Sequence, residues 1–251
     1  MLTAEPDQTA EIDVRAARTS PLELLDARAG YGRIEVLHGV SIAVPTGGVA
    51  ALLGPNGAGK TTALSVLSGV LRPTSGCRHV HGRHVNAAGA DDLARIGICH
   101  VREGRSVFPN LSVDDNLQVA ASAGAPIGRL REVAFSLFPR LGERRKQLAG
   151  TLSGGEKQML ALARGLGTDP SVLLIDELSM GLAPLVVSEL YEAVAAIART
   201  GVSVLVVEQF ATIGLQHAEV VYVMSRGRVT YAGDKGGAEH AIQAAYLGTE
   251  A

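Results

Sequence analysis

The chain has little cysteine, no excess of either charge and no long apolar run, and each shortage excludes a class of protein. Cys77 and Cys99 are the only cysteines among 251 residues, which rules out a disulfide framework and a Cys-x-x-Cys metal site. The formal net charge is −2, not the basic balance of a nucleic-acid-binding protein. Strongly apolar runs such as 202–207 are far shorter than the ~20 residues that a membrane span needs. We therefore expect a soluble chain with no nucleic acid partner.

The length and the first twenty residues bound the domain organisation. At ~150 residues per domain, the chain makes one large domain or two small ones, and it is long enough to fold without disulfides or metals. Residues 1–20 place acids among small polar residues, so we predict a disordered extension ahead of a single domain over residues 21–251. The extension lacks the basic start and apolar centre of a secretory signal, which predicts a cytoplasmic protein.

Short apolar runs alternate with helical patterns along most of the chain. The patterns predict buried strands at Val49–Leu53, 172–175 and 202–207, and helices at 60–69 and 186–199. Continuous apolar runs separated by helices predict an α/β fold with a largely parallel sheet covered on both faces.

The middle of the chain follows a different pattern. Residues 91–150 show little strand signal, and their apolar residues recur at helical spacing: Ile127, Leu130, Val133, Ala134, Leu137, Phe138 and Leu141. We expect a helical subdomain over about residues 91–155, inserted into a core made of about 21–90 and 156–251.

A glycine-rich segment follows the first buried strand and matches the nucleotide phosphate loop G-x-x-x-x-G-K-[ST] at every fixed position. Glycines let backbone N–H groups approach phosphate oxygens, and a helix starting near Gly59 favours an anion at its N-terminus. Lys60 would bind the β- and γ-phosphates, and the Thr61 hydroxyl would bind Mg²⁺. A glycine-rich turn with a chance lysine is the weaker alternative, because a strand precedes the segment and a helix follows it. The predicted nucleotide-binding residues are Gly54, Pro55, Asn56, Gly57, Ala58, Gly59, Lys60, Thr61 and Thr62.

Two acidic residues, Asp176 and Glu177, end the second buried strand. Asp176 would reach the Mg²⁺ beside the phosphates through water, and Glu177 would polarise an attacking water molecule. The alternative is a strand that simply ends in two solvated acids. The phosphate loop earlier in the chain favours a site that hydrolyses a nucleotide.

The string Leu152-Ser-Gly-Gly-Glu156 indicates the subclass of nucleotide-binding protein. Ser153 and Glu156 have the spacing of a capping box, which by itself would only begin a helix. Two glycines in a first helical turn cost ~1 kcal/mol each relative to alanine, so they make better sense where bare N–H groups meet an anion. This string, after a phosphate loop and before an acidic strand end, resembles the ATP-binding-cassette (ABC) ATPases over roughly residues 22–248.

The resemblance implies the ABC ATPase fold: a P-loop NTPase core, an N-terminal antiparallel β subdomain and an inserted helical signature subdomain. Two cassettes would dimerise head to tail on ATP. Tyr31 stands where the family has an aromatic residue that stacks on adenine; packing on its own loop is the alternative. The residues implied to contact the ATP of the partner chain are Ser153, Gly154, Gly155 and Glu156.

Three positions depart from the general family pattern. Glu103 replaces a glutamine in the loop that leads to the helical subdomain, Ala183 replaces an aspartate, and Gln209 replaces the histidine of the switch segment. A glutamine can donate a hydrogen bond to the γ-phosphate but cannot relay a proton as imidazole does. The resemblance implies two catalytic residues, Glu177 and Gln209, and three Mg²⁺ ligands, Thr61, Glu103 and Asp176.

Several strings together resemble one subgroup of the family. They are Glu103-Gly-Arg105 before Phe108, residues 111–117, Gly181-Leu-Ala-Pro184, Val-Glu-Gln209 and Ala245-Tyr-Leu-Gly248. They are similar to the shorter ATP-binding subunit of branched-chain amino acid importers, whose close relatives serve urea and short amides. Leu178 and Arg102 replace prolines that are usual there, from which we expect only small local changes.

The subgroup implies an ATPase on the inner face of the cell membrane, coupled to solute uptake. Its partners would be membrane-spanning permease subunits, a second ABC ATPase subunit and, indirectly, an extracytoplasmic solute-binding protein. The segment from Glu103 to Leu117 would dock the permease. One alternative is a non-transport ABC ATPase that acts on DNA or ribosomes. Such proteins usually have long coiled coils or a second cassette, and this sequence shows neither. The other alternative is a nucleotide-binding regulator that does not hydrolyse ATP; the presence of Lys60, Asp176 and Glu177 argues against it.

Two remaining clusters are predicted to be ordinary surface. His79, His81 and His84 have no Asp or Cys beside them, so an exposed hairpin is favoured over a metal site. Arg144-Arg-Lys146 is predicted to be a solvated helix end.

Overall fold

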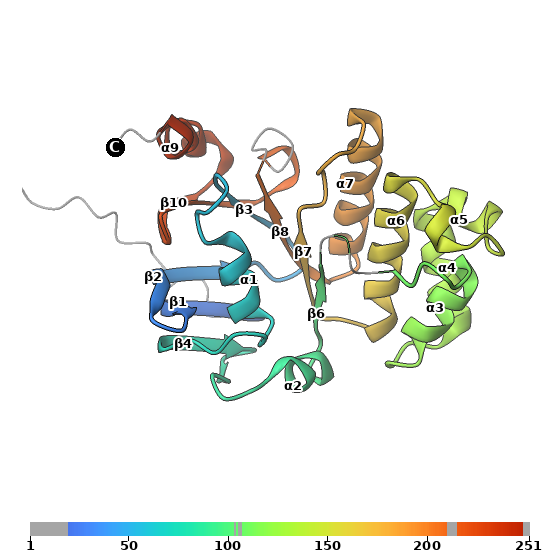
Figure 1. Cartoon of the computed structure of the whole chain (residues 1–251), viewed down its shortest axis with the longest axis horizontal. Helices are drawn as coiled ribbons and strands as arrows, with labels where there is room; N and C mark the ends of the chain where they lie inside the picture. The colour runs from blue at the N-terminus through green and yellow to red at the C-terminus, as the bar shows by residue number, and fades with distance from the viewer. Residues whose placement is uncertain (1–19, 103, 105–106, 210–214, 248–251) are drawn as a thin grey trace, which may run out of the picture.

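Two sheets form the framework of the protein (Figure 1). The computed structural model describes residues 20–102, 104, 107–209 and 215–247. One sheet has the strand order β2-β1-β4-β5 and is antiparallel. The other has the order β10-β9-β3-β8-β7-β6 and is parallel except for β10 at its edge. The described strands are β1 Leu22–Tyr31, β2 Ile34–Val44, β3 Val49–Leu53, β4 Ser75–Val80, β5 Arg83–His84, β6 Ile98–Val101, β7 Val172–Asp176, β8 Ser203–Glu208, β9 Val220–Ser225 and β10 Arg228–Gly233.

The central strands β3, β7 and β8 are buried along their whole length. Successive side chains of a strand point to opposite faces, so a sheet covered on both sides needs continuous apolar strands. Leu174 of β7 accordingly belongs to the core on one face, and its neighbour Ile175 belongs to the core on the other. These three strands confirm the predicted buried runs.

Helices cover both faces of the parallel sheet (Figure 1). On one face, α1 and α2 share a core with the antiparallel sheet. The helices α3 to α7 share the core of the opposite face, and α9 packs on β9 and β10. The described helices are α1 Lys60–Leu67, α2 Ala90–Arg95, α3 Val113–Ala121, α4 Ile127–Leu137, α5 Pro139–Glu143, α6 Gly154–Gly165, α7 Pro184–Arg199 and α9 Lys235–Leu247, with 3-10 turns η2 Ala149–Thr151 and η3 Leu166–Thr168.

The segment predicted to be a helical subdomain, in which the sequence shows little strand signal, also contains a strand of the parallel sheet. β6 lies within residues 91–150 and pairs in parallel with β7, Ile98 opposite Val172 and Val101 opposite Ile175. Its four residues include Cys99 and His100 and give no recognisable period. Pairing with a fully buried neighbour determines its conformation. The helical layer of α3, α4, α5 and α6 follows β6 and precedes β7.

The structure places both clusters that were predicted to be ordinary surface. β4 and β5 form a hairpin in which His79 lies opposite His84, as expected. Among the described residues, no group of three or more His, Cys, Asp or Glu is arranged to hold a metal. The solvated helix end is confirmed, because Arg144 is the C-cap of α5 and Arg144, Arg145 and Lys146 are all exposed. Arg144 also pairs with Glu156 at 3.0 Å, and Arg145 pairs with Asp114 at 3.1 Å. Among the described helices, none has the length and apolar character needed to cross a membrane.

Candidate nucleotide-binding site

The phosphate loop joins β3 to α1 and presents backbone N–H groups at the start of a helix. Gly57 and Gly59 have φ angles of +79° and +103°, a region that residues with a side chain rarely adopt. Gly59 is the N-cap of α1, and the described first turn of α1 carries no acidic residue. A side chain at Gly54 would lie 2.3 Å from the carbonyl oxygen of Met224. The unpaired N–H groups and the helix dipole therefore form an anion site.

The Lys60 side chain turns back over this loop. Its Nζ donates hydrogen bonds to the carbonyl oxygens of Gly54 at 2.7 Å and Pro55 at 3.2 Å. It also lies 3.8 Å from Oε1 of Glu177. Burial lowers the pKa of Lys60, and the carboxylates of Glu177, Asp176 and Glu208 oppose that shift. The lysine thus brings a positive charge into a dehydrated site, where it acts strongly on a phosphate.

A hollow of about 190 Å³ opens directly over the loop. Residues of β2, the loop, α1 and the end of β7 line it: Val36, Asn56, Gly57, Gly59, Lys60, Thr61, Thr62 and Glu177. Tyr31 pairs with Ile34 at the same end of the β1–β2 hairpin as Val36, and its side chain is 54% exposed. The aromatic ring is therefore accessible but does not line the hollow, and adenine stacking by Tyr31 stays a prediction.

The acidic pair lies where β7 ends beside β8. Asp176 is the last residue of β7 and is buried, and Glu177 follows with a φ of +48°. The Glu177 N–H donates to the carbonyl oxygen of Val207 at 3.0 Å, which fixes the turn. Parallel strands β3, β7 and β8 bring their carboxyl ends to one edge, so the phosphate loop and both acids meet there. The structure thus brings together the residues predicted from two distant motifs.

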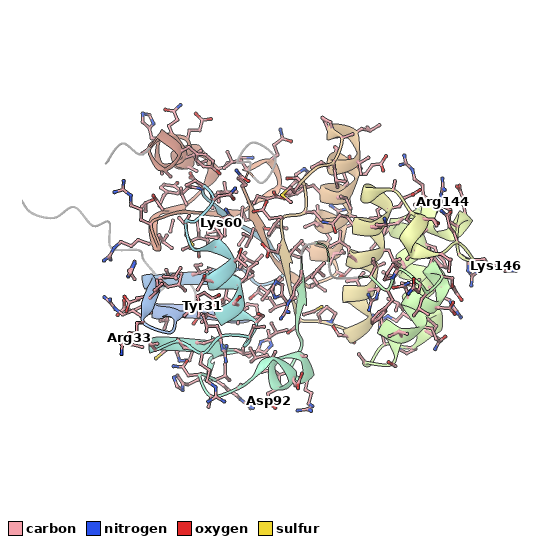
Figure 2. The ribbon with its side chains drawn as sticks, viewed as in Figure 1. Tyr31, Arg33, Lys60, Asp92, Arg144 and Lys146 are labelled. Carbon is pink, nitrogen blue, oxygen red and sulfur yellow. The ribbon has the colours of Figure 1, made fainter. Side chains whose placement is uncertain are left out.

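The signature segment begins α6 on the other side of the sheet. Ser153 is the N-cap, its Oγ accepts from the Glu156 N–H at 3.3 Å, and its own N–H donates to Glu156 Oε2 at 2.9 Å. Glu156 also pairs with Arg144. The capping box, which was the alternative to a phosphate contact, is therefore present. Ser153 and Gly154 are nevertheless exposed. Figure 2 shows Arg144 and Lys60 far apart, on opposite sides of the molecule.

Gln209 follows the last residue of β8 and is half-buried. The hydroxyl of Tyr246, on α9, donates a hydrogen bond to the Gln209 carbonyl oxygen. Two predicted positions have other outcomes. Glu103 lies outside the described residues. Ala183 is the N-cap of α7, and it provides no side-chain acceptor for the described first turn of that helix.

The sequence matches known proteins over most of its length. A family model described as ABC transporter matches residues 37–179. Identity is 40% over 201 residues to the high-affinity branched-chain amino acid transport ATP-binding protein BraG of Pseudomonas aeruginosa, covering 79% of this chain and 86% of BraG. It is 30% over 215 residues to the probable branched-chain amino acid transport ATP-binding protein LivF of Archaeoglobus fulgidus, covering 84% and 91%.

The chain belongs to the ABC transporter family. Its fold matches the solved ADP conformation of MJ1267, an ATP-binding cassette of an ABC transporter, with a TM-score of 0.81 at 24% identity, covering 91% of this chain and 99% of that one. The described sheets and helices are those of the expected ABC ATPase fold. As an ABC cassette, the protein is an ATPase coupled to transport.

The cassette also contains a buried carboxylate that the sequence analysis did not select. Glu208, the last residue of β8, has no exposed surface. It accepts hydrogen bonds from the Ser179 N–H at 3.0 Å, the Ser179 hydroxyl at 2.7 Å and the Tyr191 hydroxyl at 3.0 Å. Burial raises the pKa of Glu208, and these hydrogen bonds oppose that shift. The available signal was an acid directly after the apolar run 204–207.

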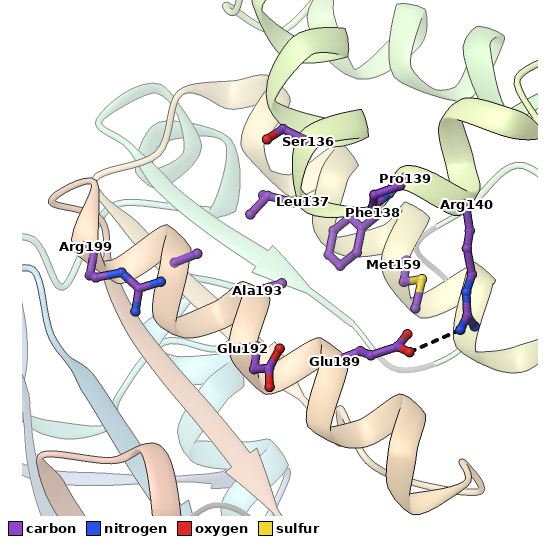
Figure 3. A pocket seen from close by; sticks show the side chains of 11 residues that line it. Ser136, Leu137, Phe138, Pro139, Arg140, Met159, Glu189, Glu192, Ala193 and Arg199 are labelled. Atoms are coloured by element: carbon purple, nitrogen blue, oxygen red, sulfur yellow. Dashed lines mark hydrogen bonds and ion pairs between the residues drawn. The ribbon is translucent and has the colours of Figure 1, made fainter.

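A second hollow of the cassette lies away from the phosphate loop. It has a volume of about 450 Å³ and separates the α4–α5 corner from the second half of α7. The ion pair between Arg140 and Glu189, 3.1 Å long, bridges it (Figure 3). Phe138 and Met159 form its floor. None of the predicted nucleotide-binding residues lines this hollow.

Proposed function

We propose that this cassette drives import of branched-chain amino acids through separate membrane-spanning subunits, from the cytoplasmic side of the membrane. The observation that carries the proposal is the 40% identity with BraG, a branched-chain amino acid transport ATP-binding protein. LivF, which bears the same description, adds a second relative. The site of this chain is built to bind ATP and not the transported solute. We therefore assign recognition of the solute to the partner subunits.

A head-to-tail pair of cassettes is part of the proposal. The phosphate loop lies on the α1 side of the parallel sheet, and the signature begins α6 on the opposite side. The exposed Ser153 and Gly154 therefore need a second cassette to reach a bound nucleotide. The exposed Gly154 N–H lies at a helix N-terminus, which favours an anion, while the capping box occupies the Glu156 N–H. Met180 and Leu185, after the acidic strand end, are 48% and 72% exposed and suit burial in such a pair.

A Mg²⁺ ion fits the oxygen donors of the site. Asp176 is a buried carboxylate whose charge is felt by Lys60, and Thr61 follows Lys60 in the first turn of α1. Carboxylate and hydroxyl oxygens, completed by phosphate and water, are the ligands that Mg²⁺ prefers. When bound, the ion would neutralise charge on the β- and γ-phosphates. Thr61 and Asp176 are proposed to hold it, with Glu103 as the third predicted ligand.

Glu177 is proposed to act as the base for the attacking water. It lines the hollow over the phosphate loop, where its carboxylate faces Lys60. A base within reach of the water contributes ~10²–10⁴-fold to the rate. Gln209 is proposed to donate its amide N–H to the γ-phosphate, since it has no titratable group to relay a proton. Tyr31 is proposed to stack on adenine.

Uptake by a reconstituted transporter tests the proposed function. Proteoliposomes would hold the membrane subunits, both cassettes and internal ATP-Mg²⁺, with the solute-binding protein outside. We expect accumulation of labelled leucine that requires ATP and is abolished by Lys60→Ala. ATP-dependent uptake of labelled urea or acetamide without leucine would assign the transporter to amides. ATP hydrolysis without uptake of any of these solutes would contradict the proposal.

A further inference from the structure

The buried Glu208 lies between two segments to which the proposed function gives chemical roles. Ser179, its partner through two hydrogen bonds, is two residues after Glu177. Gln209 follows Glu208 directly in the chain. The Glu208 carboxylate therefore links two segments. One follows the proposed base Glu177, and the other leads directly to the proposed γ-phosphate donor Gln209. The link crosses from the loop after β7 to the end of β8.

Both carboxylate oxygens of Glu208 accept hydrogen bonds from well-placed donors. Ser179 supplies its backbone N–H and its hydroxyl, and Tyr191 supplies a hydroxyl from α7. The Tyr191 ring stacks on His217 with centroids 5.3 Å apart, which holds the phenol in place. Three donors on one buried acceptor form a rigid unit, because breaking any of them leaves a buried polar group unpaired.

Burying a carboxylate here is not the simplest way to build a core. Apolar residues of similar volume commonly stabilise a protein as well as a buried polar network does. The four residues of β8 before Glu208 are apolar and fully buried, so a further apolar residue would continue the strand. An acid is also unfavourable beside other acids, and the charge of Glu177 itself raises the pKa of Glu208. These costs point to a role beyond packing.

We propose that Glu208 is a positioning residue for hydrolysis: by binding Ser179 it fixes Glu177 and Gln209 relative to each other. The inference rests on the proposed roles of those two residues. Because Glu208 does not line the hollow, it does not contact a bound nucleotide, and its hydrogen bonds reach Glu177 and Gln209 through their neighbours in the chain. Loss of the link would let the two segments move independently and slow the chemical step, with little effect on nucleotide binding.

Glu208→Gln tests the link with little change in volume. The glutamine keeps one acceptor oxygen but replaces the charged one with an N–H₂ donor, so the Ser179 hydroxyl must turn round to accept and the link loses its charge-assisted hydrogen bonds. In the reconstituted transporter we expect kcat for ATP to fall at least tenfold. The Kd for a fluorescent ATP analogue should stay within about twofold. A purely structural role would lower stability without separating kcat from Kd in this way.

Ser179→Ala tests the other end and remains informative if Glu208→Gln fails to fold. It removes the hydroxyl donor and keeps the backbone N–H, so we expect a smaller fall in kcat, about threefold, at unchanged Kd. The double variant should be no slower than Glu208→Gln alone, because both changes break one link. Tyr222→Phe is the matched control. It removes a buried hydroxyl that binds Ala43, on the antiparallel sheet, and should keep the wild-type kcat.

Three results would overturn the inference: a wild-type kcat in Glu208→Gln, a wild-type kcat in Ser179→Ala, or losses that multiply in the double variant. A Kd that rises as much as kcat falls would also contradict it. Glu177→Gln, measured in parallel, separates this failure from failure of the proposed function. If Glu177→Gln turns over normally, the proposed roles are wrong. If only Glu177→Gln is slow, Glu208 alone has been misassigned.

Discussion

The Nζ of Lys60 lies 3.8 Å from Oε1 of Glu177, so the buried lysine faces an acid of the same site. A bound phosphate places further negative charge beside this lysine, whose side chain is only 5% exposed. We expect Lys60→Ala to weaken ATP binding by ~1.5–3 kcal/mol, the scale of a hydrogen bond to a charged group. Titration with a fluorescent ATP analogue measures this loss.

Lys60 also binds the carbonyl oxygens of Gly54 and Pro55, so its removal can loosen the loop. Lys60→Arg keeps the charge and a donor, and should bind ATP better than the alanine variant. Equal affinity of Lys60→Ala and the wild type would contradict the phosphate-loop assignment.

Glu177→Gln should retain ATP but hydrolyse it ~10²–10⁴-fold more slowly, because the amide cannot accept the proton of the attacking water. The ATP-bound pair of cassettes should then persist, with this chain or its sister cassette. Size-exclusion chromatography with ATP-Mg²⁺ would show the pair. Turnover at the wild-type rate would remove Glu177 from the role of base.

Gln209→Ala should lower turnover by about tenfold to a hundredfold, since a phosphate oxygen then lacks a donor in a water-poor site (~1–3 kcal/mol). Gln209→His should keep most activity. Steady-state ATPase rates of the reconstituted complex, with the change in this subunit only, measure both effects.

A competing view makes this cassette the weak half of an asymmetric pair, with turnover in the sister subunit. An unimpaired Gln209→Ala variant would support that view. Tyr246→Phe is a useful companion, because it removes the hydrogen bond to the Gln209 carbonyl and leaves the amide side chain intact. We expect its loss of turnover to be smaller than that of Gln209→Ala.

Ala183→Asp should raise the free energy of unfolding by ~1 kcal/mol. Ala183 is the N-cap of α7 with φ −67° and ψ 145°, the geometry in which a side-chain oxygen can accept a first-turn N–H. The new charge also interacts favourably with the helix dipole. Thermal unfolding should shift upward by roughly 2–4 °C. Ala183→Gly, which offers no acceptor, is the control and should change the midpoint far less.

His100 makes stability depend on pH. Burial, assisted by the charge of Arg102, lowers its pKa from 6.5 to about 4. Within the described part of the chain, neither ring nitrogen has a hydrogen-bond partner. The folded state therefore disfavours the proton, so the stability that the neutral ring contributes is present above pH 6.5 and is lost as the pH falls toward 4.

The test is His100→Phe, compared with the wild type by urea unfolding across this range. The wild type should lose stability more steeply, by up to about 1.4 kcal/mol per pH unit for the one proton. Parallel pH profiles of the two proteins would show that His100 is not protonated on unfolding.

Much of the parallel core could be predicted from local pattern. β3, β7 and β8 are continuous apolar runs, and such runs suit only a strand covered on both faces. β6 could not be predicted, because its conformation depends on β7, which is more than seventy residues away in the chain. α7 begins two residues before the periodic pattern, at a proline whose fixed φ suits the first position of a helix.

The residues of the site could likewise be predicted where they form a consecutive motif, and could not be predicted where packing brings them together. The phosphate loop and the acidic strand end carry their chemistry in consecutive residues, so spacing alone was sufficient to select Lys60 and Asp176. The partners of Glu208 were not visible, because Ser179 and Tyr191 approach it only once β7, β8 and α7 are packed. A lone acid after an apolar run has no period and no motif. Only burial distinguishes it from a solvated strand end.

The helical layer is an insertion in the chain between two strands that are neighbours in the sheet. β6 and β7 remain paired, Ile98 to Val172, whatever lies between them. Helices α3, α4 and α5 pack on α6. A change in the length or sequence of this layer can therefore be accommodated without shifting the register of β7, the strand that ends in Asp176.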